Sequence, residues 1–108
     1  MSNYFFIQSQ EPYSEARARH QYRLAADLQQ AGHQVQVLLV QNGVLPARVT
    51  AQSEEFEQLL SSGVTVLADR FSLDQREIGA TDLKAAVKPG DVGLAVDAML
   101  AGDKVIWN

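Results

Sequence analysis

Four short apolar runs, separated by segments with helical features, constrain the fold of this 108-residue chain more than any other feature. The runs cover residues 4–7, 35–40, 64–68 and 104–107, and each contains β-branched or aromatic side chains. Continuous runs of this length are typical of strands covered on both faces, as in a parallel sheet. Strands that alternate with helices connect through right-handed crossovers. We therefore predict an α/β fold, with one parallel sheet between helices.

The segments between the runs carry the start and stop signals of helices. Residues 14–31 are predicted as a long helix, with Ser14 as its cap, Glu15 in its first turn and Gly32 just beyond its end. A second helix is expected to start at Ser53 and end near residue 63, and a last one is expected from Asp91 to near residue 102. Between them we expect a helical turn over residues 81–87, broken by Pro-Gly at 89–90, with a short edge strand at 86–88 as a weaker signal. The side chains expected to face the sheet are Leu24, Ala25, Leu28, Ala31, Phe56, Leu59, Leu60, Leu94, Ala95, Ala98 and Met99.

The length and composition indicate one domain spanning residues 1–108. Nine basic residues against 13 acidic ones make the chain acidic, and no basic run is present, so nucleic-acid binding is disfavoured. No apolar stretch approaches the roughly 20 residues of a membrane span, and no signal peptide is evident. The two histidines and scattered acids predict no metal site, and no Gly-rich dinucleotide motif or other cofactor signature is present. We expect a cytoplasmic protein without a cofactor.

The third run leads directly into the most informative segment. Residues 68–78 read Ala-Asp-Arg-Phe-Ser-Leu-Asp-Gln-Arg-Glu-Ile. This segment resembles the DsrE/DsrF-like family, which includes the TusB/C/D subunits of the sulfur relay, where the same frame reads Ala-Cys-Gly-x-Cys-Leu-x-x-Arg-Gly-Ile. Further matches in order along the chain are Glu-Pro-Tyr at 11–13, Ala-Gly-His-Gln-Val at 31–35, Leu-Val-Gln-Asn-Gly-Val at 39–44 and Ala-Gly-Asp-Lys-Val-Ile at 101–106.

The resemblance implies a three-layer α/β/α, flavodoxin-like architecture of four to five mostly parallel strands, and assembly into oligomers. It also implies that the first cysteine of the frame carries sulfur as a persulfide. Here Asp69 and Ser72 stand at the two cysteine positions, and the chain has no cysteine at all. Persulfide transfer requires a thiolate, which neither a carboxylate nor a serine hydroxyl replaces. The expectation is a scaffold without the sulfur chemistry of the family, and no catalytic residue.

Any functional site is expected where the loops after the strands meet at one edge of the sheet. Those loops cover residues 8–13, 41–46 and 69–76. Asp69 either lines a retained pocket or caps the helix that follows it. Ser72, through the Ser-Leu-Asp-Gln spacing of 72–75, is predicted to form a capping box, and Arg76 to pair with a nearby acid or bind an anion. The candidate pocket or partner-binding residues are Glu11, Tyr13, Asn42, Asp69, Arg70, Ser72 and Arg76.

Three functions remain open at this stage. The first is a non-catalytic, oligomeric accessory subunit related to sulfur relay, with Tyr4, Tyr22 and Trp107 as candidate interface aromatics. The second is a sulfur-handling protein that presents a pocket to a persulfide cysteine on a partner, such as another sulfur-relay protein. The third is a receiver-like signalling domain with Asp69 as phosphoacceptor, which lacks the acidic pair needed for Mg²⁺ because its first loop offers only Glu11.

Overall fold

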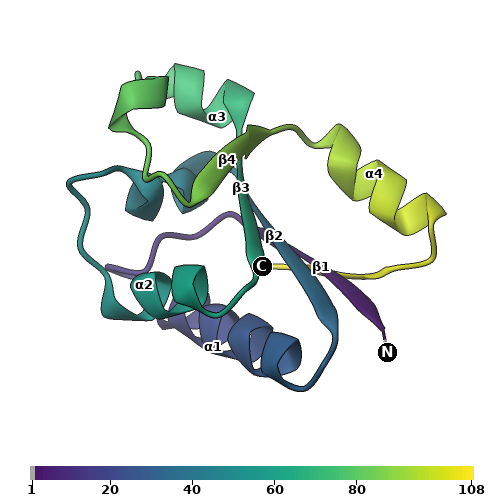
Figure 1. Cartoon of the computed structure of the whole chain (residues 1–108). Coiled ribbons are helices and arrows are strands. Elements are labelled where there is room, and N and C mark those ends of the chain that lie inside the picture. The colour runs from purple at the N-terminus through teal and green to yellow at the C-terminus, as the bar shows by residue number, and fades with distance from the viewer. Residues whose placement is uncertain (1) are drawn as a thin grey trace.

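A five-stranded parallel sheet forms the centre of the computed structural model, which describes residues 2–108 (Figure 1). The strands are β1 (Asn3–Gln8), β2 (Gln34–Leu39), β3 (Thr65–Asp69), β4 (Val87–Gly90) and β5 (Lys104–Trp107). The α-helices are α1 (Ala16–Gln30), α2 (Glu54–Ser61), α3 (Arg70–Gln75) and α4 (Gly93–Leu100), and two 3₁₀ segments are η1 (Gln41–Ala47) and η2 (Ala80–Asp82).

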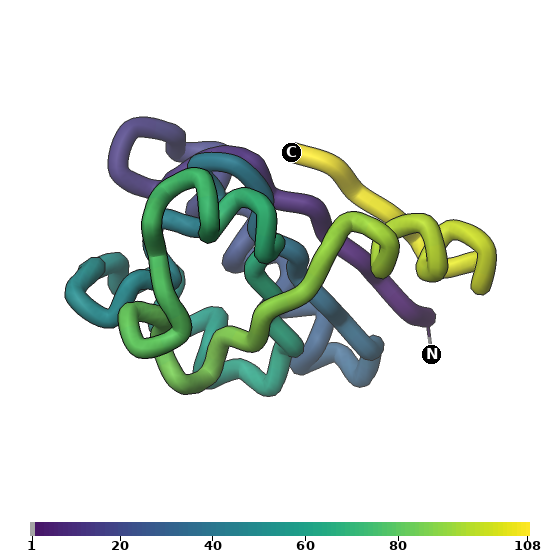
Figure 2. The backbone as a smooth tube through the Cα atoms, turned by 90° about the horizontal axis from the view of Figure 1, so that it is seen from above, coloured from purple at the N-terminus to yellow at the C-terminus, as the bar shows by residue number. Residues whose placement is uncertain are grey.

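The strand order β4-β3-β2-β1-β5 follows from the connections. From β1 to β4 each new strand pairs with the previous one, and α4 then returns the chain across the sheet to place β5 beside β1. Figure 2 shows this closing contact, in which the yellow end of the chain runs alongside the purple β1. Every pairing is parallel, as the continuous apolar runs predicted.

Helices cover the two faces of the sheet unequally. In Figure 1, α1 and α2 lie on one side of the strands, α4 lies on the other, and α3 stands at the end of β3. The larger core lies under α1 and α2, where the rings of Tyr22 and Phe56 pack edge to face at a centroid distance of 5.4 Å. The smaller core, on the α4 side, contains Phe5, Ile7, Leu38, Val40, Ala95 and Ala98. No helix within residues 2–108 combines the length and apolar character that crossing a bilayer requires.

The four predicted strands and the edge strand are confirmed, and so are the cap at Ser53 and the turn at Gly32. Ser53 Oγ accepts a hydrogen bond from the Phe56 N–H at 3.3 Å. Gly32 has φ of +98°, the left-handed conformation that ends a helix at little cost for glycine. The predicted edge strand is β4, and it extends to Gly90, so that Pro89 lies within it. An edge strand tolerates a residue without an N–H, because one of its sides is unpaired.

Two other predicted features are wrong. The helical turn over 81–87 is absent; η2 ends at Asp82, and Leu83 instead forms an antiparallel bridge with Arg48. Ser14 does not cap α1, which begins two residues later after Glu15, because Glu11 takes both the N–H and the hydroxyl of Ser14.

Some expected inward-facing residues point to solvent. Leu24 is 47% exposed and Met99 is 56% exposed, and Ala31 is exposed as well. In α1 the buried side chains are Ala18, Gln21, Tyr22 and Ala25, and Leu28 packs partly buried against the larger core, so the predictions for Ala25 and Leu28 are confirmed and those for Leu24 and Ala31 are wrong. Tyr22, expected at an interface, is 1% exposed and belongs to the core.

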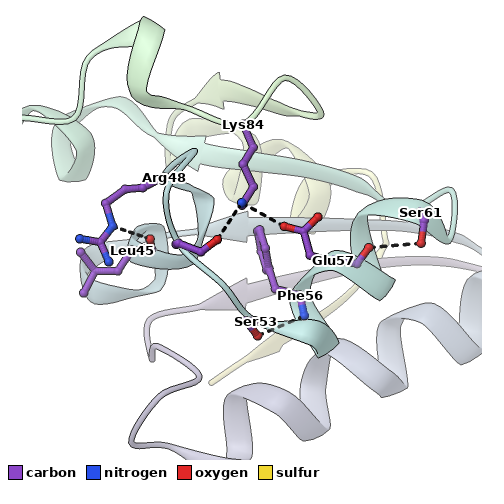
Figure 3. Close-up of polar contacts among 8 residues, drawn as sticks. Leu45, Arg48, Ser53, Phe56, Glu57, Ser61 and Lys84 are labelled. Carbon is purple, nitrogen blue, oxygen red and sulfur yellow. Dashed lines mark hydrogen bonds and ion pairs between the residues drawn. The ribbon is translucent and has the colours of Figure 1, made fainter.

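Lys84 joins three segments on the α2 side of the structure (Figure 3). Its Nζ donates to the Ala51 carbonyl at 3.0 Å and lies 3.0 Å from Glu57 Oε1, while the Lys84 N–H donates to the Ala47 carbonyl at 2.8 Å. The Lys84 side chain is 14% exposed and that of Glu57 is 53% exposed. Lys84 therefore ties the segment before β4 to the connection between η1 and α2.

We predict that Lys84→Met lowers the free energy of unfolding by about 1–2 kcal/mol, because a charge-assisted bond to the partly buried Ala51 carbonyl is lost. Glu57→Gln is expected to cost less than about 1 kcal/mol, because a half-exposed ion pair is weak. Urea denaturation of both variants measures the difference. Equal losses in the two variants would show that the ion pair, and not the carbonyl contact, provides the stability.

Candidate functional site

The ends of β1, β2 and β3 lie together at one edge of the sheet. The register pairs Gln8 with Leu39 and Leu39 with Ala68, so the residues that follow each strand emerge side by side. A parallel sheet places all its loops after the strands on this edge. The loops predicted to carry the site therefore start from the same edge.

Asp69 forms the corner between β3 and α3. It is the N-cap of α3 and is 6% exposed, and its Oδ2 accepts the Ser72 N–H at 3.0 Å. The same oxygen accepts the Ser72 hydroxyl at 2.7 Å. A carboxylate at a helix N-terminus satisfies free N–H groups and faces the positive end of the helix dipole. The predicted helix-capping role of Asp69 is confirmed.

The predicted capping box at Ser72 is wrong. Ser72 lies inside α3, in its third position, and is itself the residue that Asp69 caps. Its hydroxyl oxygen accepts the Gln41 N–H at 2.8 Å while its proton goes to Asp69. Ser72 thus connects the corner after β3 to the turn after β2; its bond to Asp69 is buried and its bond to Gln41 is partly buried.

The turn after β2 has an unusual backbone that this bond supports. Gln41 has φ of +53°, a conformation that costs energy for a residue with a side chain. Two residues later, a Cβ on Gly43 would lie 2.1 Å from the Gln8 carbonyl oxygen, so only glycine allows η1 to pass this close to β1. Glycine at position 43 is therefore required by the close approach of the η1 backbone to the end of β1.

Arg76 and Asn42 extend the same cluster to the surface. Arg76 Nη2 donates to Asn42 Oδ1 at 3.0 Å, and Nη1 donates to the Ser72 carbonyl at 3.2 Å. The expected pairing of Arg76 with a carboxylate is not observed among residues 2–108. Asp69, Ser72, Asn42 and Arg76 form one hydrogen-bonded corner, which we call the β3 corner.

Three of the predicted site residues lie outside the β3 corner. Arg70 is exposed and approaches Asp91 at 3.8 Å, at the start of the connection to α4. Glu11 and Tyr13 belong to the loop after β1, where Glu11 accepts the Tyr13 N–H at 2.7 Å. The Ser14 hydroxyl, which also donates to Glu11, is the main cause that lowers the pKa of the Glu11 carboxyl.

A buried amide pair beneath the first loop was missed from the sequence. Gln8 is fully buried at the end of β1, and its Nε2 donates to Gln21 Oε1 of α1 at 2.6 Å. Gln8 Oε1 accepts the Gln10 N–H at 2.8 Å and the Asn108 amide at 3.3 Å. The signal available was a glutamine that ends an apolar run. Burial raises the pKa of the neighbouring Tyr22 phenol, whose hydroxyl has no hydrogen-bond partner among the described residues.

The polar side chains of the β3 corner are held by hydrogen bonds to one another and to the backbone. The Ser72 hydroxyl donates to a carboxylate and no histidine contacts it in the part of the chain described here, so it has no general base of the usual kind. Within residues 2–108 no three His, Asp or Glu side chains gather as a metal site would require. A hollow of about 460 Å³ lies between the C-terminal halves of α1 and α2, away from this edge.

The receiver-like hypothesis is not supported by this topology. Receiver domains have the strand order 2-1-3-4-5, whereas this sheet has 4-3-2-1-5. The Asp69 carboxylate also accepts the Ser72 N–H at the N-terminus of α3, and it is therefore engaged as a helix cap instead of being exposed as a phosphoacceptor would be.

We predict that Asp69→Ala lowers the free energy of unfolding by about 1–3 kcal/mol, because it removes a cap and leaves buried groups of Ser72 unpaired. Asp69→Asn keeps an acceptor oxygen and is expected to cost less than Asp69→Ala. Asp91→Ala is the matched control, since Asp91 accepts the Gly93 N–H at 2.9 Å in an exposed position and its loss is expected to cost about 0.5–1 kcal/mol. Thermal and urea unfolding measure the series. An Asp69→Ala protein as stable as the Asp91→Ala protein would contradict the prediction.

Comparisons with known proteins place this geometry in a family. Three solved structures are similar over almost the whole chain: the ychN protein from E. coli (TM-score 0.84, 22% identity, 100% of both chains); MTH1491 from Methanobacterium thermoautotrophicum (0.78, 22%, 99% of this chain and 98% of that one); and BT1422 from Bacteroides thetaiotaomicron (0.75, 16%, 97% and 94%). The last two are described as proteins of unknown function, and at these identities the likeness concerns the fold. A search of curated protein sequences gave no match. The model of the DsrE/DsrF-like family matches residues 2–107, and the chain therefore belongs to the DsrE/DsrF-like family.

Proposed function

We propose that this protein is a non-catalytic member of its family, a cytoplasmic accessory subunit that forms oligomers and assists sulfur relay between other proteins. The observation that carries the proposal is the β3 corner. The two positions where the family frame has cysteine hold Asp69 and Ser72, and their side chains bond to each other at 2.7 Å in the interior. They stabilise the corner, and neither offers a thiolate to carry sulfur.

The exposed face of α4 supports the oligomeric part of the proposal. Val92, Val96 and Met99 recur at helical spacing and are 54–57% exposed, and Leu100 beside them is 83% exposed. Trp107 at the end of β5 is 66% exposed. Gathered apolar side chains of this kind are costly in water, and they commonly mark protein–protein contacts. We assign this α4 face, defined by residues 92, 96, 99 and 100, as the contact between subunits.

A second candidate function is the presentation of a pocket to the persulfide cysteine of a partner. The observation that favours it is the position of Arg76 and Asn42, which reach the surface directly above the buried part of the β3 corner. A guanidinium at this place is suited to an anionic sulfur group. In this function the sulfur remains on the partner's cysteine, and this chain provides only the pocket that receives it.

We predict that the protein is an oligomer and that Val96→Glu dissociates it. A charge placed in an apolar contact costs roughly 3 kcal/mol or more, which is about a hundredfold in the dissociation constant. Size-exclusion chromatography with light scattering measures the mass. Val49→Glu is the matched control, because Val49 is 51% exposed but lies in the connection after η1. A monomeric wild-type protein at high concentration, or equal dissociation by both variants, would count against the α4 face.

We further predict that the protein changes sulfur transfer without carrying sulfur. Transfer of labelled sulfane sulfur between two cysteine-bearing relay proteins is followed with and without this chain, and intact-mass spectrometry examines each component. The rate should change when this chain is omitted, and its own mass should stay that of the unmodified polypeptide. An unchanged rate contradicts the accessory role, and covalent sulfur on this chain contradicts the non-catalytic one.

A further inference from the structure

Arg48 and Arg76 come from two distant segments and line the same hollow, next to the β3 corner. The hollow has a volume of about 230 Å³, and its remaining lining is Val49, Thr50, Glu77, Ile78 and Asp82. Its walls are held in place by backbone contacts, because the Val49 N–H donates to the Asp82 carbonyl at 2.7 Å and Arg48 bridges to Leu83. The two guanidinium groups are therefore presented by a connected piece of structure.

Neutral groups accept the hydrogen bonds of both arginines, and neither guanidinium forms an ion pair with a carboxylate among residues 2–108. Arg48 Nε donates to the Leu45 carbonyl at 2.8 Å, and Arg76 donates to the Ser72 carbonyl and the Asn42 amide. The ion pairs found among residues 2–108 involve other cations: Arg23, Arg70 and Lys84. Figure 3 shows the Arg48 guanidinium turned away from the Lys84–Glu57 pair, and the dashed line from Arg48 leads only to Leu45.

Two carboxylates also line the hollow, and they limit what it binds. Asp82 Oδ2 accepts the Gly79 N–H at 3.1 Å, so part of its charge is directed to a backbone turn. Glu77, exposed and with φ of +55°, has no such bond among the described residues. Its negative charge opposes an anion in the hollow, and its removal should strengthen binding.

We propose that this hollow binds a small tetrahedral oxyanion of the phosphate, sulfate or thiosulfate type. Guanidinium groups form paired, charge-assisted hydrogen bonds to such oxygens, and Thr50 adds a hydroxyl to the lining. The volume admits a small anion more readily than a nucleotide or cofactor, whose sites generally exceed about 300 Å³. The inference goes beyond the accessory role proposed above, since it needs neither a partner protein nor sulfur transfer.

The test is a titration of the whole ¹⁵N-labelled chain at low ionic strength with sodium phosphate, sulfate and thiosulfate, with sodium chloride as the ionic-strength control. Amide shifts of Val49, Thr50 and Glu77 should move with saturation for the oxyanions and not for chloride. The three separate titrations compare the anions, and the one with the lowest dissociation constant is the preferred ligand. Absence of saturable shifts with all three oxyanions overturns the proposal.

Variants connect the binding to these two arginines. Arg48→Gln and Arg76→Gln should each weaken binding about tenfold or more, whereas Arg70→Gln, which removes the same charge outside the hollow, should change it less than twofold. Glu77→Gln should tighten binding by a few-fold, and this gain in affinity cannot come from a damaged fold. Equal weakening by Arg70→Gln would reduce the effect to net charge, and looser binding by Glu77→Gln would place the anion elsewhere; either result overturns the proposal.

Discussion

The hydrogen bonds of one buried serine hydroxyl connect the elements that matter most in this structure. Ser72 Oγ donates to Asp69 at the end of β3 and accepts from the Gln41 N–H just after β2. Asp69 and Ser72 are both buried, and a buried polar group without a partner costs about 1–3 kcal/mol, so each of these two side chains depends on the other. This arrangement fixes the direction of α3 and supports the strained backbone of Gln41, and Arg76 and Asn42 meet at the surface above it.

The fold followed from the sequence where the physics is local. Four apolar runs were sufficient to predict the parallel strands, because burial on both faces requires continuous apolar segments. The start of α2 could be predicted from Ser53, because its capping bond is to Phe56, three positions away in the chain. The inner faces of α1 and α4 were less predictable. Leu24 and Met99 are apolar yet exposed, because they lie on the faces of α1 and α4 that turn away from the core, whereas Tyr22, Ala25 and Ala98 lie in it.

The candidate site could be predicted by its location and only partly by its contacts. The three loops emerge from one edge because parallel strands dictate it. The capping box at Ser72 failed because a tertiary bond from Gln41, 31 positions away, holds that hydroxyl inside α3. The contacts of Arg76 with Asn42 and of Gln8 with Gln21 also join separate segments, and no spacing in the sequence predicts them. A sequence pattern predicts hydrogen bonds between residues that are near in the chain. The partners of Ser72, Arg76 and Gln8 are distant in the chain, and only the folded sheet brings them together.

The side chains of Asp69 and Ser72 determine what this corner contributes to the protein. A reactive thiolate must be accessible and partly unsatisfied, and a site that holds one therefore gives up some stability. Asp69 and Ser72 are instead buried and bonded to each other and to the backbone, which is the arrangement of a stabilising contact. In the proposed oxyanion site, the positive charges of Arg48 and Arg76 act on a group that arrives from outside. Because Asp69 and Ser72 are engaged in these bonds, we propose that the chain contributes through what it binds.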